Sequence, residues 1–559
     1  MAFLVSPGVQ VKEIDLTNVV PSTSSTIGAM AGAFDTGPVN EVVTVSSETE
    51  LVEKFGKPTS DTYESVLTAA QFLSYGSALK VVRAVGSSAR NATASGTGIL
   101  AKNDVHFSTL SPAAGDWVMA RHPGVRGNSL QVEVATLASS WEGSADWQSW
   151  TEGAPGTSTG AAAVGGSADE IHIVVRDIDG TITGTIGEVL EVFSYLSQGS
   201  DVKSTDGTSL YYKDHINTNS KWIRIGNHPA ALTDAGESAT GNAFTRVNVF
   251  STTVTGGIDN NDIEVGETTA MYAKFADAET VDVSLVFQAN SGFNSSDTIT
   301  LSNYIIALCA ARKDAVGFVS PERAATANAA APATSVAAWR TGLSSTSYGF
   351  ADSSSLYVYD KYNDKYRWIA AAGSTAGLTA NADLVADAWF SPAGFTRGNV
   401  RNVTKLAFNP NQADRDALYK TGVNPIVTFP GSGTVLFGDK TLQTRPSAFD
   451  RINVRRLFIV LEKAISSASK ASLFEFNDEF TRAQFRNMVE PFLRDVKGRR
   501  GITDFKVVCD GTNNTGNIID TNKFVADIYV KPARSINYIT LNFIATRTGV
   551  EFSEIAGGN

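Results

Sequence analysis

The chain has 559 residues, of which 42% are hydrophobic and 18% are charged, and its formal net charge is −11. This length and composition predict a globular protein of two to four domains and exclude a disordered chain. The acidic balance argues against a nucleic-acid-binding surface over the whole protein.

The first 90 residues predict a short terminal arm followed by the start of an α/β core. In the arm, residues 1–22, Val9, Val11 and Ile14 alternate loosely as in a strand. An arm this short cannot bury its own apolar side chains, so it must dock on its own domain or on a neighbour. The first core segment, residues 23–90, is expected to contain in order a small apolar run 27–34, a helix opened by a Ser47/Glu50 capping box, helix 63–75 and buried strand 79–85.

Between residues 91 and 255 the character of the chain changes, and Gly, Ser, Thr and Ala become frequent. Leu130–Val134 and Ile171–Val175 read as strands, and residues 151–167 read as a loop. We interpret residues 91–255 as a mostly β insertion carried on the outside of a core, because a long surface insertion adds little loop-closure entropy.

After residue 255 the β/α pattern returns. We divide this region into a second core segment, residues 256–375, and a C-terminal core domain, residues 376–546. The predicted strands are 281–288 and 315–319, with 505–509 and 524–530 as core strands, and the predicted helices are 301–312, 382–390, 412–422, 453–466 and 481–496.

The chain ends as it begins, with a segment that can form a strand. In this second arm, residues 547–559, the apolar positions are Val550, Phe552 and Ile555. The predicted fold is therefore a multidomain α+β or mixed α/β protein with a discontinuous α/β core, a β-rich outer insertion and extended strand arms at both ends. Exposed strand edges of this kind invite pairing with another chain.

No segment combines the residues of an active site with the context that such a site needs. Gly156–Gly160 has the spacing of a nucleophile elbow around Ser158, but no strand precedes it and no helix follows. Asp177–Gly180 begins like a calcium loop, yet the later ligands are out of register, which favours an Asp-Gly turn. The five histidines lack metal-site spacing. We therefore predict no enzymatic activity, no cofactor and no metal.

Two further features concern the cellular environment. Cys309 and Cys509 lie in apolar contexts, which favours buried thiols in a reducing compartment over a disulfide. The sequence shows neither a basic-apolar leader nor a long uncharged apolar run. We expect a soluble protein that no signal peptide exports and that does not insert into a membrane.

Several stretches of the sequence carry a resemblance to one known family. The second half contains Trp389-Phe390-Ser391-Pro392-Ala393-Gly394-Phe395-Thr396-Arg397-Gly398, Phe437-Gly438-Asp439-Lys440-Thr441 and Phe449-Asp450-Arg451-Ile452-Asn453-Val454-Arg455-Arg456-Leu457. The end contains Lys531-Pro532-Ala533-Arg534-Ser535-Ile536-Asn537-Tyr538, and the front contains Ser6-Pro7-Gly8-Val9. Their number and order resemble the tail sheath proteins of contractile-tailed, T4-like bacteriophages. The resemblance extends over residues 5–86 and 300–555 and is weak from 90 to 280.

The resemblance implies a structural subunit that stacks as six-fold rings around a rigid tube, with residues 376–546 as the inner sheath core. In that family, terminal arms add strands to the sheets of neighbours, and the sheath contracts without nucleotide. The implied partners are further copies of the chain, the tail tube, the baseplate and the tail terminator, but not nucleic acid. The implied location is the virion tail after assembly in the host cytoplasm. The alternatives are the sheath of a pyocin-like or type VI contractile system and, from a different class, a β-rich carbohydrate-active enzyme.

Residues 451–500 contain eleven Lys or Arg and six Asp or Glu, which gives a local net charge of +5 in an acidic chain. A contact with the tube has to be released, and exposed ion pairs are weak enough for that. The hypothesis is that the tube faces a cluster formed by Arg494, Lys497, Arg499 and Arg500. The alternative is that these cations complement the end of their helix in solvent or against a neighbouring subunit.

A second group of cations, Arg451, Arg455 and Arg456, lies at or near a predicted helix start. The helix dipole disfavours positive charge there, so these arginines are expected to pair with carboxylates. Arginine suits both buried and interface ion pairs, which leaves two alternatives open: pairs within the subunit and pairs across a lattice contact.

Overall fold

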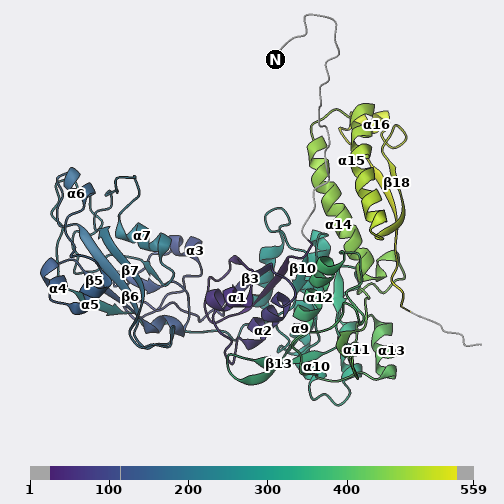
Figure 1. Ribbon diagram of the computed structural model, residues 1–559, viewed down its shortest axis with the longest axis horizontal. Coiled ribbons are helices and arrows are strands. Elements are labelled where there is room, and N and C mark those ends of the chain that lie inside the picture. The colour runs from purple at the N-terminus through teal and green to yellow at the C-terminus, as the bar shows by residue number, and fades with distance from the viewer. Residues whose placement is uncertain (1–24, 114, 538–559) are drawn as a thin grey trace, which may run out of the picture. The chain divides into compact units, whose positions relative to one another are not determined.

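The computed structural model describes residues 25–113 and 115–537, and these fold as two units, residues 25–471 and residues 472–537 (Figure 1). Each unit contains both helices and strands, and the larger one contains several separate sheets. The predicted multidomain, mixed α/β fold class is confirmed. None of the described helices combines the length and apolar composition that a membrane span requires.

Six strands form the central sheet of the larger unit, and they come from both sides of the 91–255 segment. Their order is β12-β11-β10-β1-β3-β2, and every neighbouring pair is parallel except β2 with β3. The bounds are β1 Gly28–Ala33, β2 Val42–Val45, β3 Leu79–Ala84, β10 Leu285–Phe287, β11 Val316–Val319 and β12 Gly349–Ala351. Because β1 lies between β3 and β10, the chain leaves this sheet after β3 and rejoins it on the other side of β1.

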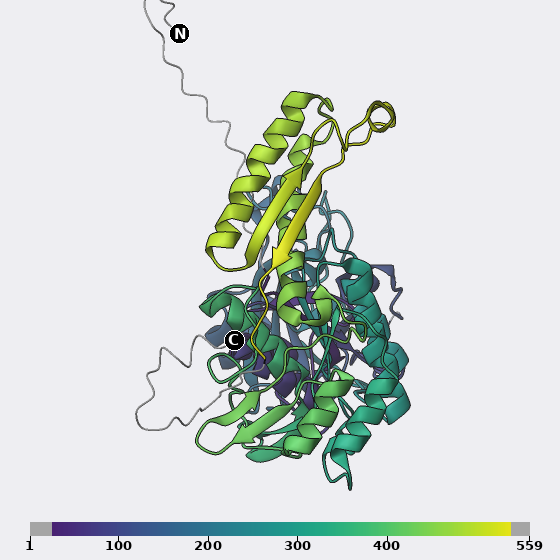
Figure 2. The same ribbon diagram turned by 90° about the vertical axis from the view of Figure 1, so that its right-hand side faces the viewer.

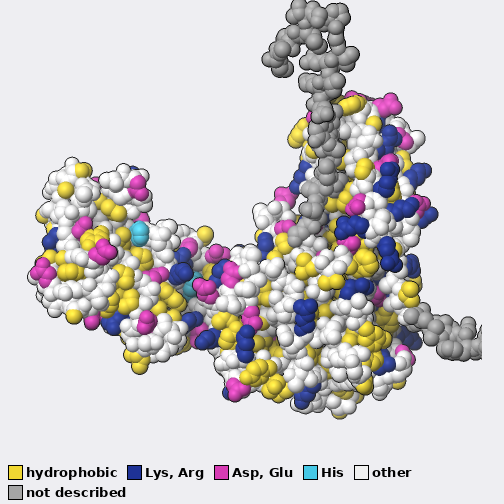
Figure 3. Space-filling model, in the orientation of Figure 1, with side chains coloured by type: hydrophobic (Ala, Val, Ile, Leu, Met, Phe, Trp, Pro, Cys, Tyr) yellow, Lys and Arg dark blue, Asp and Glu magenta, His cyan; other side chains and the backbone are white. Residues whose placement is uncertain are grey.

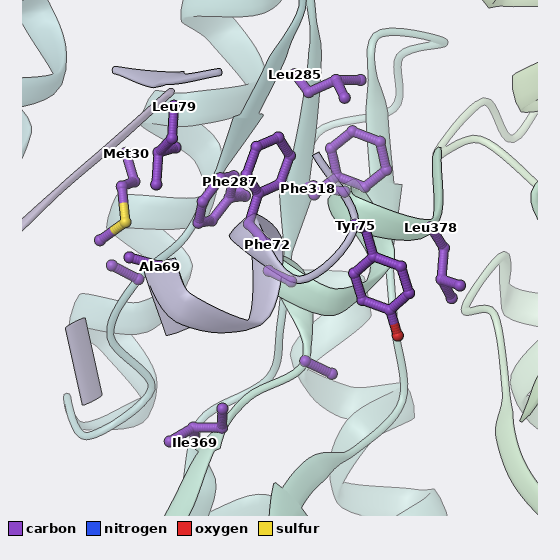
Figure 4. Close-up of a cluster of buried hydrophobic side chains, with 14 of the residues drawn as sticks. Met30, Ala69, Phe72, Tyr75, Leu79, Leu285, Phe287, Phe318, Ile369 and Leu378 are labelled. Carbon is purple, nitrogen blue, oxygen red and sulfur yellow. The ribbon is translucent and has the colours of Figure 1, made fainter. Parts of the chain in front are cut away.

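Helices cover both faces of this sheet, since alternate side chains of a strand point to opposite sides. Met30 packs in one cluster with residues of α2 (Tyr63–Leu73) and α12 (Ala372–Val385). Ala29 and Ala31 pack in another cluster with residues of α9 (Ser295–Arg312). Figure 4 shows the first cluster, in which the rings of Phe72 and Phe287 stack with centroids 5.1 Å apart.

The small residues of β1 are explained by how closely α2 approaches the sheet. All six residues of the strand are buried. A Cβ atom at Gly28 would lie 2.5 Å from the ring of Phe72, so only glycine allows this contact. The small apolar run in the sequence is therefore a central strand covered on both faces.

Smaller antiparallel sheets and further helices complete the core of the larger unit. The strands are β13 Ser355–Asp360, β14 Lys365–Ala370, β15 Lys405–Leu406, β16 Ile426–Phe429 and β17 Gly433–Leu436, arranged as β14-β13-β15 and β16-β17. The helices are α1 Glu48–Phe55, α8 Val265–Tyr272, α10 Arg323–Thr326, α11 Pro332–Thr341, α13 Gln412–Thr421 and α14 Ile452–Ser469, with 3-10 turns η2 Ala273–Phe275 and η3 Ala448–Asp450.

The segment between β3 and β10 has sheets and a hydrophobic core of its own. Its strands are β4 Val118–Ala120, β5 Leu130–Ala135, β6 Glu170–Asp177, β7 Glu188–Ser197, β8 Ile223–Ile225 and β9 Phe250–Thr253, arranged as β7-β6-β5-β9 and β4-β8. Both strands predicted there lie within β5 and β6. Its helices are α3 Asp104–Thr109, α4 Ala138–Glu142, α5 Ala145–Trp150, α6 Thr159–Ala163 and α7 Tyr212–Asn219, with 3-10 turn η1 Val125–Ser129.

A buried arginine ties the end of β3 to the start of this segment. The Arg83 side chain, 1% exposed, donates hydrogen bonds to the carbonyl oxygens of Phe34, Asp35 and Gly37 at 2.9 to 3.0 Å. It also donates to the carbonyl of Pro123 at 3.0 Å. Burial lowers the pKa of Arg83 to about 10, which still leaves the group charged at neutral pH. One side chain thus donates to four main-chain carbonyls from both sides of the junction.

The smaller unit, residues 472–537, consists of a long helix and a β-hairpin. Its elements are α15 Glu479–Gly498, β18 Ile502–Val508, α16 Gly516–Asp520 and β19 Asp527–Pro532. Figure 2 shows α15 lying beside the antiparallel pair of β18 and β19. The expectation of core strands here was wrong. Only Ile502 is buried in the two strands, because a two-stranded sheet with one helix beside it remains half-exposed.

Three local predictions also differ from the structure. The helix expected at 382–390 is α12. It begins at Ala372, ten residues before the predicted start, in a run rich in Gly, Ser, Thr and Ala, and it ends at Val385. Residues 372–380 of that run are all buried, so packing overrides the weak helix propensity of its Gly, Ser and Thr residues. The loop expected at 151–167 contains the short helix α6. Ser47 caps α1 as predicted, but the Glu50 carboxylate accepts from the Ser46 N–H, so the capping box is incomplete.

A buried carboxyl group lies at the carboxyl end of the central sheet. Asp352, immediately after β12, is fully buried and accepts a hydrogen bond from Ser320 Oγ at 2.6 Å. Burial raises the pKa of Asp352 from 3.8 to about 7. Because the folded protein holds this proton more tightly than the unfolded chain, the free energy of unfolding should fall as pH rises from about 4 to about 7.

We therefore expect Asp352→Asn to remove this part of the pH dependence. In the wild type, ionisation of Asp352 lowers the free energy of unfolding by about 1.4 kcal/mol for each pH unit within that window. The amide of the variant cannot ionise, so this loss should disappear. Thermal unfolding at pH 5 and pH 8 measures the difference, and the variant should gain stability relative to wild type at pH 8. Asp416→Asn, at an exposed carboxylate, is the control. Identical pH profiles for wild type and Asp352→Asn would contradict the assignment.

Candidate assembly surfaces

The hairpin of the smaller unit presents unpaired strand edges. β18 pairs with β19 alone in register Phe505↔Val530 and Val507↔Ile528, with an irregularity between Ile502 and Asp504. Among the described residues, each strand therefore has an outer edge without a partner strand. Such edges expose rows of N–H and C=O groups, which form a template for a strand from another chain.

The hairpin is held in place by the apolar face of α15. The buried residues of this helix recur at helical spacing: Thr481, Phe485, Met488, Val489, Leu493 and Val496. Phe485 packs edge-on against Phe524, which precedes β19, with ring centroids 5.4 Å apart. The side chain of Asp478 caps the helix by accepting from the Thr481 N–H at 2.8 Å. The packed helix α15 thus supports a two-stranded sheet whose two outer edges are open.

All four cations of the predicted tube-facing cluster are exposed at the end of α15. Figure 3 shows Lys and Arg side chains gathered over α15 and β18. Lys497 lies 3.3 Å from Asp504, and Arg499 lies 3.6 Å from Asp495, so these two form exposed ion pairs within the unit. Arg494 lies one turn before Lys497, and Arg500 adopts a left-handed conformation with φ 68°. Exposed pairs of this kind are weak and can exchange partners.

The second arginine group pairs within the subunit at two of its three positions. Arg456 makes a two-pronged contact with Asp383 of α12, with Nη2 2.5 Å from Oδ2. Both side chains are at least 94% buried. Arg451, the residue that caps α14, lies 3.0 Å from Asp439 and donates to the hydroxyl of Tyr419. Nearby carboxylates thus offset the unfavourable helix dipole.

Arg455 is buried by aromatic rings. Its guanidinium carbon lies 4.4 Å from the centroid of the Tyr348 ring and 4.0 Å from that of Phe449. Its Nη1 donates to the Tyr348 hydroxyl at 3.0 Å. Among the described residues no carboxylate forms an ion pair with Arg455, so the alternative of a pair within the subunit is not met at this position. A lattice role for the three arginines stays a prediction.

The Arg456–Asp383 pair also holds the first described residue of the chain. Ser25 Oγ donates to Asp383 at 2.5 Å, and Arg456 Nη2 donates to the carbonyl of Ser25 at 2.8 Å. Three distant segments therefore meet at one buried ion pair. The predicted arm residues Val9, Val11, Ile14, Val550, Phe552 and Ile555 lie outside the described residues.

The candidate chemical motifs have structural roles. Ser158 caps α6, and its hydroxyl donates to the buried carboxylate of Asp169 at 2.7 Å, so this hydroxyl is held by an aspartate and not by a histidine. Asp177 accepts hydrogen bonds from Ser129 and Thr183 and shapes the turn after β6. In the part of the chain that the structure describes, no three His, Cys, Asp or Glu residues gather to hold a metal ion.

Comparison with known families gives a consistent result along the chain. A model of the phage tail sheath protein central domain matches residues 266–442, and a model of the phage tail sheath C-terminal domain matches residues 444–546. A model of the tail sheath protein Gp18 domain III N-terminal region matches residues 25–84. These ranges adjoin the 85–265 segment on both sides.

Whole-length relatives decide the family. The chain is 33% identical to the tail sheath protein of Vibrio phage KVP40 over 704 aligned residues, which cover 99% of this chain and 100% of that protein. It is 32% identical to the tail sheath protein of Enterobacteria phage T4, over 99% of both chains. This chain belongs to the tail sheath protein family.

Solved structures of much lower sequence identity share the fold. The crystal structure of a sheath tail protein from Listeria innocua matches with a TM-score of 0.54 at 12% identity, covering 92% of this chain and 96% of that one. A sheath tail protein from Desulfitobacterium hafniense matches with a TM-score of 0.51 at 11% identity, over 94% and 100% of the two chains. The resemblance read from the sequence to the tail sheath family is confirmed.

Sequence reasoning missed two exposed apolar sets of this sheath protein. One lies before and at the start of α15, and the other consists of phenylalanines from three separate segments of the larger unit. The first left a signal, because Phe476 and Phe480 fall outside the helical spacing of the buried face of α15. The second left none, because only folding brings its members together.

The buried Arg456–Asp383 pair should be strongly coupled. Arg456→Ala leaves the Asp383 carboxylate buried without its cation, and we expect a loss of about 3–5 kcal/mol in the free energy of unfolding. Combining Arg456→Met with Asp383→Leu should recover most of that loss, because no uncompensated charge remains. Urea denaturation measures both variants. Arg494→Ala, at an exposed cation, should stay within about 0.5 kcal/mol of wild type. A double variant no more stable than Arg456→Ala would contradict the coupling.

Proposed function

We propose that this chain is the structural subunit of a contractile phage tail sheath. Copies stack as six-fold rings around the tail tube, and the sheath contracts without nucleotide to drive the tube through the host envelope. The observation that carries the proposal is the whole-length similarity to the tail sheath proteins of phages KVP40 and T4. Long hollow tubes or rings of purified protein in negative-stain micrographs support it, and a persistent monomer at high concentration contradicts it.

Under this proposal each segment of the chain has its own structural role. Residues 1–22 and 547–559 are arms, residues 23–90 and 256–375 form the core, residues 91–255 are an outer insertion, and residues 376–546 form the inner sheath domain. The arms add strands to hairpins of adjacent copies, and the open edges of β18 and β19 support this role. Each added main-chain hydrogen bond contributes about 0.5–1.5 kcal/mol net.

The proposed partners are other copies, the tail tube, the baseplate and the tail terminator, and the proposed location is the virion tail after assembly in the host cytoplasm. The chain acts without catalysis, cofactor, nucleic acid or membrane insertion. Sheaths of related injection systems are the nearest alternative, since an anti-feeding prophage baseplate chain matches with a TM-score of 0.51 at 13% identity. That likeness concerns the fold alone, whereas identity above 30% to T4-like phage proteins favours the phage tail.

Contraction requires contacts of two strengths. Strand pairing between copies can persist while the bodies of the subunits rotate, because the connectors rich in Pro, Ser and Thr act as hinges. Contacts with the tube have to be released, and the exposed cations at the end of α15 provide weak ones. The extended sheath is then held by a kinetic barrier until a trigger at one end releases it.

A chain that lacks residues 1–22 should fold but should not assemble. The lost strand removes several inter-subunit hydrogen bonds, while the described core begins only at residue 25. Circular dichroism checks the fold, and negative-stain microscopy checks for tubes. A chain truncated after Ile555 keeps the apolar positions of the second arm and serves as control. Tubes from the first variant at the wild-type concentration would defeat the arm model.

The tube-facing hypothesis has its own variant. Arg499→Glu combined with Arg500→Glu should impair assembly of sheath on purified tubes and leave the monomer folded, because exposed charges carry little of the folding free energy. Lys523→Glu, another exposed cation of the same unit, is the control. Normally sheathed tubes from the double variant would show that this cluster does not face the tube.

A further inference from the structure

Four large apolar side chains lie exposed before and at the start of α15. Leu473, Phe474, Phe476 and Phe480, here called the apolar tip, are 62%, 104%, 83% and 73% exposed. The charged residues within 473–480 are Glu475, Asp478 and Glu479, and all are acidic. The tip lies at the opposite end of α15 from the basic cluster, and a 20-residue helix separates the two by about 30 Å.

A second aromatic surface lies on the larger unit. Phe395, Phe429 and Phe437, here called the phenylalanine triad, pack against one another with centroid distances of 5.2 to 6.0 Å. Phe395 and Phe437 are 57% and 42% exposed. One ring comes from a loop, one from the end of β16 and one from the residue after β17, so the triad is a product of the tertiary structure.

One arginine contacts the triad, and a second follows Phe395 closely in the sequence. The guanidinium of Arg415 lies 5.7 Å from the centroid of the Phe429 ring. Arg397, two residues after Phe395, stacks on Phe390 at 5.3 Å and donates to a carbonyl oxygen. Neither arginine forms an ion pair with a carboxylate inside the described ranges. The triad therefore offers an aromatic centre with available positive charge at its border.

The two surfaces are complementary in character. Both expose phenylalanine rings to water, which single soluble chains rarely do in clusters unless another surface covers them. Aromatic residues and arginine are enriched in protein interfaces and contribute most of the binding free energy there. The tip carries only negative charge, and the border of the triad carries available positive charge.

We propose that the apolar tip of one copy docks on the phenylalanine triad of a neighbouring copy. Glu475 and Glu479 then face Arg397 and Arg415 across the contact. This inference rests on the proposed function, because it requires copies of the chain to assemble. The contact joins two different surfaces, and such heterologous contacts build rings and helical tubes rather than closed dimers.

The physical character of the contact suits a joint that persists through contraction. Apolar burial is proportional to the area removed from water and is only weakly affected by salt, so a contact between several aromatic rings is durable. A surface that must be released from the tube would instead need weak contacts that exchange easily. For this reason we assign the tip to a second copy rather than to the tube.

Site-specific disulfide formation tests the contact directly. Glu475→Cys and Thr396→Cys place thiols beside the tip and the triad without removing an aromatic ring, and the native Cys309 and Cys509 are buried. In oxidised tubes of the full-length variant we expect a ladder of covalently linked copies. Glu475→Cys with Ile186→Cys, at a residue that is 78% exposed in the outer segment, should give none.

The outcomes separate this contact from the proposed function. If the Glu475→Cys/Thr396→Cys variant forms tubes without a ladder, the docking proposal is wrong while the sheath function stands. A link within single monomers in dilute solution, or a link from the thiol introduced at position 475 to the tube protein in sheathed tails, would also overturn it. If the wild type forms neither rings nor tubes, it is the sheath function that fails.

Charge exchange provides a second test. Arg397→Glu with Arg415→Glu should raise the protein concentration at which tubes form by about tenfold or more, because like charges then face each other. Combining these changes with Glu475→Arg and Glu479→Arg should restore assembly to near the wild-type concentration, and thermal unfolding verifies that every variant folds. An unchanged threshold in the first variant, or no restoration in the combined one, refutes the pairing.

Discussion

The pairing of β1 with strands from two distant regions of the chain is the constraint on which the rest of this structure depends. β1 meets β3 after a connection that contains β2, α1 and α2, but it meets β10 only after about two hundred further residues, with Gly28 opposite both Leu79 and Leu285. A loop of that length costs only slightly more closure entropy than one half as long, so the core tolerates the segment between them. Once the strands have joined, α2, α9 and α12 can cover the sheet, and α12 can present Asp383 to α14.

Electrostatics serves two different purposes in the molecule. Arg83 and Arg456 are buried, each with several partners at fixed distances, and they join segments far apart in sequence. Removal of a partner from such a site leaves a buried polar group unsatisfied, so these sites specify one arrangement. The cations at the end of α15 are exposed, and their ion pairs are weak. The buried arginines hold a subunit together, and the exposed cations suit contacts that must be exchanged.

The proposed assembly likewise combines durable contacts with reversible ones. Main-chain pairing along the edges of β18 and β19 and apolar docking of the tip on the triad would be durable, whereas charged contacts with the tube would be reversible. A contractile sheath needs both, because its copies must remain connected while they move relative to the tube. The smaller unit carries one candidate of each kind, since the apolar tip and the basic cluster lie at opposite ends of a single helix.

The sequence by itself determined the mixed α/β class, the helix within α15, the strands within β5 and β6, and membership of the tail sheath family, because periodicity and short sequence motifs depend on nearby residues. Only the tertiary structure decided that Arg456 pairs with Asp383, 73 residues away, and that Arg455 lies between aromatic rings. The exposure of β18 and β19, which read as core strands, and the grouping of Phe395, Phe429 and Phe437 were also decided there. The physical reason is that a pattern shows which side of an element is apolar, whereas the surface that covers it is chosen by packing between segments distant in the chain.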